Sequence, residues 1–323
     1  MDLSIIIPIY NAAPLLNRCI ESIFNQKTNY SYEVIFIDDG SSDNSIEIIK
    51  KRKEKNIILY QQANSGPAAA RNKGIELAKG KYCTFIDADD YWNNGYIEQT
   101  VQFLNEHQEC VAVSVACQNF TSFSKNPSYN PSWMDNTMHE TPFVINDFFE
   151  YWANYCHVGT CSTTMCTNKV RETGGMRLDL RVTEDYEFWA YLSTFGQWGV
   201  IPSILYVSDG NDVTAKQGWV KKMEKRWNNA PSIAEWEKRI IQRLPLKLPI
   251  SFLKARGCVS RNLTYCQLLS GRLKLSRHEA LKYGIFFIQD PIGKLMNIAK
   301  YTTLTWWILA KWLQHREYHR KLK

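Results

Sequence analysis

Apolar runs rich in β-branched residues alternate with helix-type patterns in the N-terminal part of the chain. Four such runs predict strands, at Ser4–Ile7, Glu33–Ile37, Ile57–Tyr60 and Tyr82–Asp87, of which Ile57–Tyr60 is short. Between the first two runs, apolar residues recur at helical spacing, at Leu15, Leu16, Cys19, Ile20, Ile23 and Phe24. Because buried strands separated by helices are typical of α/β proteins, we expect a Rossmann-like, mostly parallel central sheet flanked by helices.

Polar residues stand where three of these strands end. The segment Pro8–Asn11 follows the first strand, Asp38 and Asp39 follow the second, and Asp87–Asp90 ends the fourth. Ligands of parallel sheets gather beyond the carboxyl ends of the strands. We therefore expect the three clusters to converge on one rim, which makes that rim the candidate site.

The turn Phe85-Ile86-Asp87-Ala88-Asp89-Asp90 predicts a metal site. Asp87 and Asp89 are two residues apart, so they lie on the same side if the extended geometry continues. Close carboxylates repel each other unless a cation neutralises them, and Mg²⁺ or Mn²⁺ prefers such oxygen ligands. The alternative interpretation is an acidic turn that only ends a strand, since Asp is common in turns.

A turn at Asn64–Pro67 opens a predicted helix, Gly66–Ala78, which carries Arg71. A helix start and a guanidinium one turn further in both suit anionic groups. The alternative is ordinary loop chemistry with Arg71 paired to a neighbouring acid. The sequence has neither G-x-G-x-x-G after the first strand nor G-x-x-x-x-G-K-[ST], which disfavours dinucleotide dehydrogenases and P-loop nucleotide hydrolases.

Composition bounds the class of protein. With 323 residues, 45% of them hydrophobic and 22% charged, the chain is typical of a folded protein with one large catalytic domain and an appendage. The nine cysteines are scattered without a C-x-x-C pair, and Met1-Asp2 leads into an apolar strand rather than continuing as a basic leader. These features favour reduced thiols and a cytosolic location.

Charged residues are distributed unevenly along the chain. Residues 215–323 carry 23 Lys and Arg against 6 Asp and Glu, whereas residues 1–214 carry 16 against 26. A basic C-terminal third indicates an anionic partner, either nucleic acid or a bilayer rich in acidic lipids. Trp306, Trp307 and Trp312 precede a cluster of His, Arg and Lys, which is the pattern of an interfacial helix. The alternative is a helical subdomain that packs on the core and ends in a solvated basic tail.

Four segments carry a resemblance to a known family. They are Ser4–Asn11 (S-I-I-I-P-I-Y-N), Val34–Asp43 (V-I-F-I-D-D-G-S-S-D), Asn64–Gly74 (N-S-G-P-A-A-A-R-N-K-G) and Phe85–Asp90 (F-I-D-A-D-D). In this order and spacing, residues 1–207 resemble an inverting, non-processive family 2 glycosyltransferase with the GT-A fold. The resemblance implies a nucleotide-sugar half in residues 1–118 and an acceptor half in residues 119–217, which together form the catalytic domain. The basic, mostly helical region 218–323 follows.

The resemblance also implies roles for the residues of the rim. Asp39 would bind uracil or ribose, while Pro8 and Tyr10 would line the binding site of the base. Arg71 would lie beside the nucleotide. Asp87 and Asp89 would be the D-x-D pair that binds Mn²⁺ or Mg²⁺, with Asp89 the more direct ligand. The donor site as a whole would comprise Pro8, Tyr10, Asn11, Asp38, Asp39, Asn64, Gly66, Arg71, Asp87 and Ala88.

The segment Thr183–Trp189 resembles the acceptor motif of the same family. On a helix, Asp185, Phe188 and Trp189 share a face, which pairs a carboxylate with flat rings for the C–H face of a sugar. We assign the general base to Asp185, which would take the proton of the acceptor hydroxyl, with Glu184 as its neighbour or alternate. The alternative is that both acids only complement the helix dipole.

The reaction implied is transfer of one sugar, with inversion, from a UDP-sugar to a hydroxyl of a glycan or of an undecaprenyl-diphosphate-linked sugar. By analogy with the family, the product would be O-antigen, capsule or another cell-surface polysaccharide, made at the cytoplasmic face of the membrane. Processive members carry Q-x-x-R-W, and the nearest match here, Met223–Trp227, lacks the Gln. Two alternatives remain: a nucleotide-sugar-binding protein without transfer activity, and a nucleic-acid-binding protein, for which the sequence shows no clear helix-turn-helix pattern.

Overall fold

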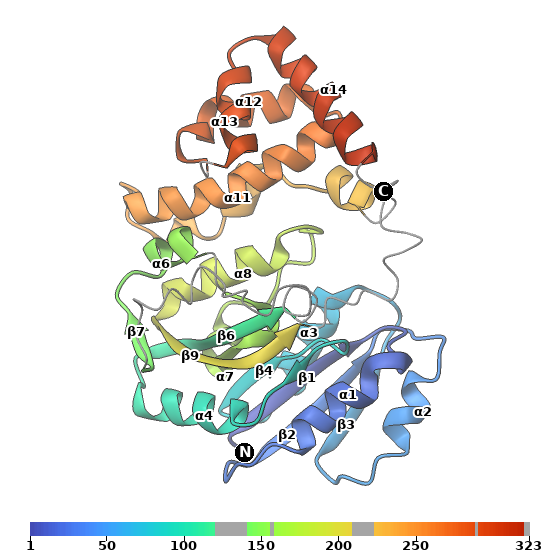
Figure 1. Cartoon of the computed structure of the whole chain (residues 1–323). Helices are drawn as coiled ribbons and strands as arrows, with labels where there is room; N and C mark the ends of the chain where they lie inside the picture. The colour runs from blue at the N-terminus through green and yellow to red at the C-terminus, as the bar shows by residue number, and fades with distance from the viewer. Residues whose placement is uncertain (120–140, 156–157, 209–222, 288–289, 320–323) are drawn as a thin grey trace. The chain divides into compact units, whose positions relative to one another are not determined.

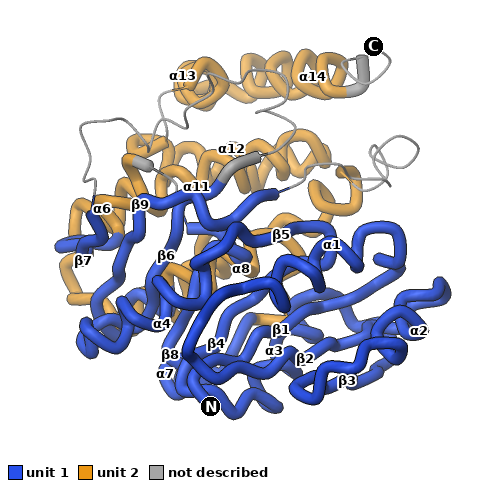
Figure 2. Tube along the Cα trace, turned by 60° about the horizontal axis from the view of Figure 1, so that its bottom comes forward, with its two compact units in different colours: residues 1–148, 157–176, 191–212 blue, residues 149–156, 177–190, 213–323 orange. Residues whose placement is uncertain are grey.

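The computed structural model describes residues 1–119, 141–155, 158–208, 223–287 and 290–319 (Figure 1). They fall into two compact units (Figure 2). Unit 1 comprises Met1–Phe148, His157–Met176 and Tyr191–Asp212, and unit 2 comprises Phe149–Cys156, Arg177–Ala190 and Val213–Lys323. The predicted domain boundary at residue 217 lies outside the described residues. Unit 2 contains residues 149–156 and 177–190, which the predicted boundaries place in the acceptor half.

In the described residues, a nine-stranded sheet runs through unit 1 in the order β3-β2-β1-β4-β8-β6-β9-β5, with β7 paired to β9. The strands are β1 (Leu3–Ile9), β2 (Tyr32–Asp38), β3 (Ile57–Gln61), β4 (Tyr82–Phe85), β5 (Tyr91–Trp92), β6 (Cys110–Asn119), β7 (Phe143–Ile145), β8 (Thr163–Cys166) and β9 (Gln197–Ser208). Strands β3, β2, β1 and β4 are all parallel, whereas β8 runs antiparallel to β4 and β6. The expected α/β fold with a mostly parallel sheet is confirmed, with some antiparallel strands added.

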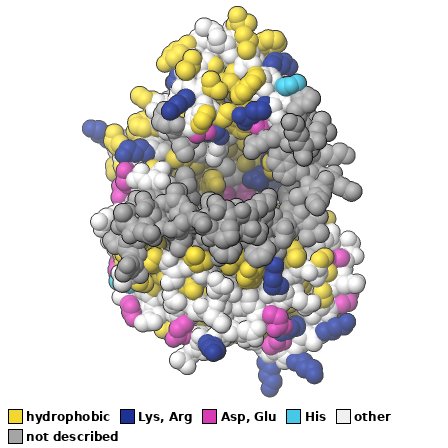
Figure 3. Space-filling model, in the orientation of Figure 1, with side chains coloured by type: hydrophobic (Ala, Val, Ile, Leu, Met, Phe, Trp, Pro, Cys, Tyr) yellow, Lys and Arg dark blue, Asp and Glu magenta, His cyan; other side chains and the backbone are white. Residues whose placement is uncertain are grey.

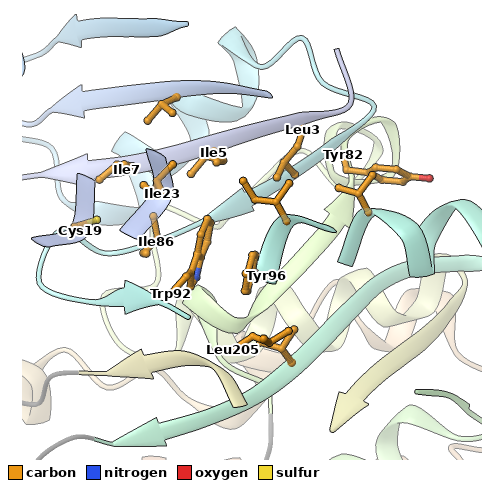
Figure 4. Close-up of a cluster of buried hydrophobic side chains, with 14 of the residues drawn as sticks. Leu3, Ile5, Ile7, Cys19, Ile23, Tyr82, Ile86, Trp92, Tyr96 and Leu205 are labelled. Carbon is orange, nitrogen blue, oxygen red and sulfur yellow. The ribbon is translucent and has the colours of Figure 1, made fainter. Parts of the chain in front are cut away.

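Helices cover both faces of the sheet, because alternate residues of a strand point to opposite sides. Helix α1 (Ala13–Phe24) packs its apolar stripe on the side of Ile5 and Ile7 (Figure 4). On the other side, α3 (Pro67–Leu77) lies so close to β1 that a Cβ added to Gly74 would come within 2.2 Å of Ile6 Cγ2. The remaining α-helices of unit 1 in the described residues are α2 (Ser45–Lys50), α4 (Tyr96–Glu106) and α7 (Thr167–Glu172).

A buried aromatic pair fixes the chain that follows β4. The rings of Trp92 and Tyr96 are stacked, with centroids 3.8 Å apart, in the core shown in Figure 4. Trp92 Nε1 donates to the carbonyl of Cys161 at 3.0 Å, and the Tyr96 hydroxyl lies 3.0 Å from Thr84 Oγ1. Burial of two large rings contributes several kcal/mol, so this pair holds the segment after Asp90 firmly on the core.

Unit 2 is helical in the residues that the structure describes. Its helices are α6 (Phe148–Tyr155) and α8 (Glu184–Leu192), which overlap unit 1 at one end, followed by α10 (Ile233–Glu237), α11 (Ile250–Leu269), α12 (Leu273–Tyr283), α13 (Pro291–Ala299) and α14 (Thr303–His319). Asp290 caps α13 by accepting a hydrogen bond from the Gly293 N–H at 2.8 Å. The expected helical C-terminal region is confirmed. Among the helices of the described ranges, none combines the length and the hydropathy that a membrane span requires.

Candidate active site

The sheet changes direction at β1, and the candidate site lies at that point. After β1 the chain adds β2 and β3 on one side, and it then returns to place β4 on the other side. In an open parallel sheet such a switch leaves a crevice beyond the strand ends. Figure 1 shows β2, β1 and β4 side by side, and they run parallel. Tyr10 follows β1, Asp39 follows β2 and Asp87 follows β4, so the three polar clusters stand at the carboxyl ends of neighbouring strands.

The loops that follow β1 and β2 are bonded to each other. Asn11 has a left-handed backbone, with φ 51°, and its N–H donates to Ser41 Oγ at 3.0 Å. Its side-chain oxygen accepts from the N–H of Ser42 at 2.8 Å. Asp43 caps α1 by accepting from the Ala13 N–H at 2.9 Å. Beside these loops the Tyr10 side chain is 57% exposed, so its ring can stack on a ligand.

Asp39 anchors the turn that begins α3. Its side chain is only 3% exposed. Oδ1 accepts from the Gln62 side chain and from the Ser65 N–H, both at 2.8 Å, and Oδ2 accepts from the Gly66 N–H at 2.8 Å. The turn needs glycine at residue 66, where φ is 92°. Sequence reasoning missed this anchoring role, and the predicted contact of Asp39 with a base or ribose remains a prediction.

The other predicted donor residues lie along the same rim. Asp38 is 2% exposed, and its carboxylate accepts from the Ser41 N–H at 3.3 Å. Pro8 is half-buried inside β1, next to Ile37 of β2. Asn64 is exposed at the tip of the turn that Asp39 holds. These residues thus stand near the carboxyl ends of β1 and β2 and in the turn before α3, where a nucleotide is expected.

Arg71 joins α3 to the acidic turn. It is 6% exposed, and its Nη2 donates to Oδ1 of Asp87 at 2.6 Å. This is the arrangement of the alternative interpretation, in which Arg71 pairs with a neighbouring acid. The pairing also places a buried guanidinium at the carboxyl end of β4, where an anionic ligand would meet it.

Asp90 and Tyr206 complete the acidic turn, and sequence reasoning gave neither of them a role. The turn closes where the Asp90 N–H donates to the Asp87 carbonyl at 3.0 Å. Asp90 is 6% exposed and accepts from the Tyr206 hydroxyl at 2.6 Å. Asp89 is exposed, and its carbonyl accepts from Arg18 at 2.6 Å. Asp90 stands inside the quoted motif, but nothing in the sequence of β9 marks Tyr206.

The carboxylates of this turn fit a hard divalent cation. Ligand atoms of Asp87, Asp90 and Cys161 lie within 4.8 Å of one another. Burial raises the pKa of the Cys161 thiol well above its usual range, and Mg²⁺ or Mn²⁺ prefers oxygen, so the two carboxylates are the suitable ligands. The Cys161 sulfur instead accepts from the Asp87 N–H at 3.2 Å. Asp87 thus clusters with Asp90 rather than with Asp89, and the roles of Asp87 and Asp89 as metal ligands remain predictions.

In unit 2, the predicted acceptor motif begins α8 after a strained residue. Thr183 has φ 65°, a left-handed conformation that is rare and costly for a β-branched residue. Glu184 and Asp185 follow at the start of α8 and are both half-buried. Asp185 Oδ1 accepts from the Tyr186 N–H at 2.8 Å. Backbone strain of this kind is concentrated at functional sites, so Glu184 and Asp185 are candidate functional residues.

A buried ion pair holds the same helix in place. Glu187 is fully buried, and Arg239 donates to both of its carboxylate oxygens, from Nε at 2.5 Å and from Nη2 at 2.7 Å. Burial raises the pKa of Glu187, and the guanidinium opposes that rise. The sequence offered no signal for this pair because its members lie 52 positions apart.

The predicted acceptor platform is wrong. Phe188 and Trp189 are both 0% exposed, and their rings pack edge to face at 4.9 Å. Helical spacing put them on one face with Asp185, but it could not show that this face is buried. Tyr186, which contacts Trp152 edge-on at 5.9 Å, is only half-buried and is the aromatic neighbour of Asp185 that the prediction overlooked.

Comparison with known sequences identifies the family. The model described as Glycosyl transferase family 2 matches residues 4–167. The Poly(ribitol-phosphate) beta-glucosyltransferase of Bacillus spizizenii is 37% identical over 118 residues, which are 35% of this chain and 19% of that protein. The uncharacterized glycosyltransferase YibD of Escherichia coli is 51% identical over 90 residues, 27% of this chain and 26% of that protein. The chain thus matches about a fifth to a quarter of the length of these two relatives.

Comparison with solved structures supports the GT-A fold. TarS 1-349 of S. aureus matches with a TM-score of 0.63 at 18% identity, over 100% of this chain and 92% of that one. The mannosyltransferase PcManGT of Pyrobaculum calidifontis, in complex with GDP-Man and Mn2+, matches with a TM-score of 0.58 at 16% identity, over 96% and 84%. Since the family model covers about half of the sequence, from β1 to the start of α7, the chain belongs to glycosyl transferase family 2.

Proposed function

We propose that this protein is an inverting glycosyltransferase that moves one sugar from a UDP-sugar to a hydroxyl of a sugar acceptor. The observation that carries the proposal is the rim of unit 1, where Arg71 and the carboxylates of Asp87 and Asp90 meet at the switch point of the sheet. A buried cation beside a pair of metal-binding carboxylates is what a nucleoside diphosphate requires.

The nucleotide is proposed to bind along the ends of β1 and β2. The exposed ring of Tyr10 stacks on the base, and Asp39 uses the remaining lone pair of Oδ2 for the base or ribose. Arg71 faces the diphosphate. The walls are formed by the other predicted donor residues, Pro8, Asn11, Asp38, Asn64, Gly66 and Ala88. TarS structures in complex with UDP and with UDP-GlcNAc, which match 100% and 99% of this chain, support the proposal of a uridine nucleotide.

Asp87 and Asp89, with Asp90 beside them, are proposed to hold Mn²⁺ or Mg²⁺. When bound, the ion would offset the negative charge of the diphosphate as it leaves. Tyr206 would orient Asp90 through its hydroxyl, and the Cys161 sulfur would hold the Asp87 backbone. The chain's own residues thereby fix the carboxylates before the donor arrives.

Asp185 is proposed as the general base, with Glu184 as its neighbour. The acceptor oxygen attacks the anomeric carbon, the bond from that carbon to the phosphate oxygen breaks, and the nucleoside diphosphate leaves. The proton of the acceptor hydroxyl passes to Asp185. A single displacement inverts the anomeric centre. The strained Thr183 and the Glu187–Arg239 pair support this role, because both fix the first turn of α8.

The acceptor is proposed to be a glycan or an undecaprenyl-diphosphate-linked sugar of a cell-surface polysaccharide. The relative named Poly(ribitol-phosphate) beta-glucosyltransferase supports a polymeric acceptor. A lipid-linked acceptor would bring the enzyme to the cytoplasmic face of the membrane, and the basic C-terminal region would bind anionic lipid there.

The test is turnover of UDP-glucose, UDP-GlcNAc and GDP-mannose with Mn²⁺ and a panel of methyl glycosides, followed by NMR of the product. We expect one UDP-sugar to be transferred with inversion. Asp185→Asn should bind UDP like the wild type but turn over at least about 100-fold more slowly, whereas Glu184→Gln should lose less. If the donor binds but its sugar is transferred to none of the acceptors, a nucleotide-sugar-binding protein would be favoured instead. A product with retained anomeric configuration would contradict the proposal.

A further inference from the structure

Helix α14 is apolar on two opposite faces. One face is buried in unit 2 through Trp306, Leu309, Ala310 and Leu313. The other faces solvent at helical spacing and carries Leu304 (64% exposed), Trp307 (49%), Ile308 (51%) and Trp312 (46%). A helix on the surface of a water-soluble unit normally has a polar outer face. We therefore expect the exposed apolar face of α14 to bind a partner.

A groove extends this face toward α12. It has a volume of about 630 Å³ and lies between α12 and α14. Leu281 and Trp307 line it together with the cationic or titratable side chains of Lys274, Arg277 and His278. Figure 3 shows hydrophobic side chains gathered with Lys and Arg over the helices α12–α14. Apolar and basic groups thus share one surface.

The exposed charge of this surface is positive because its acids are sequestered. Glu279 is 3% exposed and accepts hydrogen bonds from the Ile233 N–H and from Gln267, both at 2.8 Å. Glu317 is 7% exposed and accepts from the Tyr265 hydroxyl at 2.8 Å, and Asp290 is paired with Arg261. By contrast, lysines of the same helices are exposed, namely Lys274, Lys282, Lys294 and Lys311.

We infer that the α14 face, defined as Leu304, Trp307, Ile308, Lys311 and Trp312, docks on the surface of an anionic bilayer. Leucine and isoleucine would enter the boundary of the acyl chains, tryptophan rings would lie at the headgroups, and the lysines would meet phosphates. The inference rests on the membrane association proposed above and names the residues that carry it.

Charge complementarity favours a bilayer over a second copy of this chain. A symmetric dimer through this face would place Lys311 and the groove cations of both copies close together, where like charges repel. A bilayer with acidic lipids supplies the opposite charge along the whole face.

The test is binding of the full chain to vesicles of phosphatidylcholine, with and without phosphatidylglycerol, by co-sedimentation. We expect binding to the anionic vesicles. The double variant Trp307→Ser, Trp312→Ser and the charge variant Lys274→Glu, Lys311→Glu should each bind at least about tenfold more weakly. Leu178→Ser is the matched control, since Leu178 is 52% exposed but lies outside α12–α14. It should bind like the wild type.

Two readouts separate this inference from the proposed reaction. Transfer to a soluble methyl glycoside should be unchanged in all three variants, because none of the substituted residues belongs to the proposed active site. Wild-type protein that ignores anionic vesicles, or variants that bind them like the wild type, would overturn the docking surface. A wild-type dimer that the tryptophan variant dissociates would assign the face to a second copy instead.

Discussion

Arg71 Nη2 lies 2.6 Å from Oδ1 of Asp87, and this contact ties the first turns of α3 to the acidic turn after β4. The guanidinium is largely buried, while the Asp87 side chain keeps 36% of its surface. A buried arginine paired with a partly open carboxylate orients that carboxylate and places positive charge beside it. The pair therefore couples the expected diphosphate position to the expected metal position.

Arg71→Gln should weaken UDP binding by about tenfold or more, because the diphosphate loses a cation and Asp87 loses its partner. Calorimetry at fixed Mn²⁺ measures the change. Lys73→Gln is the matched control, since Lys73 lies on the same helix and pairs instead with Glu76 at 2.8 Å. Equal UDP affinity in Arg71→Gln and Lys73→Gln would contradict the assignment.

Tyr206→Phe should lower the apparent affinity for Mn²⁺ by about 10–100-fold while leaving the fold intact, because the variant loses only the hydroxyl that orients Asp90. Saturating Mn²⁺ should restore kcat, which a general defect in packing would not allow. Tyr60→Phe, at a residue that is 37% exposed, serves as control. A kcat that stays low at high Mn²⁺ would show that Tyr206 acts in another way.

Cys161→Ala should leave the affinity for Mn²⁺ unchanged within about threefold, because the buried thiol stays protonated and is a poor ligand for hard cations. The free energy of unfolding should fall by about 1–2 kcal/mol, since the variant leaves a small cavity and removes the acceptor of the Asp87 N–H. Asp90→Asn is the comparison and should weaken Mn²⁺ binding at least about tenfold. A large loss of Mn²⁺ affinity in Cys161→Ala would make the thiol a ligand after all.

Arg239→Ala should destabilise the protein by about 3–5 kcal/mol at pH 8, because it leaves the buried Glu187 carboxylate without its partner. Burial raises the pKa of Glu187 above the ordinary 4.5, so the ionised form is what costs stability. The loss in free energy of unfolding should therefore become smaller as the pH falls toward 4.5, because the Glu187 carboxylate is then more readily protonated. Denaturant unfolding at pH 5 and pH 8 measures it.

Lys238→Ala supplies the control for that measurement, since Lys238 is exposed and lies next to Arg239 in the sequence. It should change stability by no more than about 0.5 kcal/mol at either pH. If Arg239→Ala lowers the free energy of unfolding equally at both pH values, the loss does not come from the ionised Glu187 carboxylate.

Much of the donor half could be predicted from the sequence, because local patterns decide it. Apolar runs rich in β-branched residues favour strands, and parallel strands bring their carboxyl ends together, so Asp39 and Asp87 were expected to share a rim. The pairing of Arg71 with an acid was also foreseen as an alternative. Asp39 and Asp87 stand within two positions of a strand end, and Arg71 lies in the helix between β3 and β4.

The remaining contacts depend on tertiary packing, which a single sequence does not encode locally. Tyr206 reaches Asp90 across 116 positions, and Arg239 reaches Glu187 across 52. The misplaced acceptor platform has a related cause, because helical periodicity shows which residues share a face but not whether that face meets solvent. Phe188 and Trp189 are of residue types that can stack on a sugar, but both are buried and cannot reach one.

Calorimetric binding of UDP with and without Mn²⁺, to the wild type and to Asp89→Ala, tests the central claim most directly. The proposed donor site predicts that UDP binds to the wild type, that Mn²⁺ strengthens binding, and that Asp89→Ala removes the gain from Mn²⁺. Absence of UDP binding to the wild type under both conditions would contradict the account.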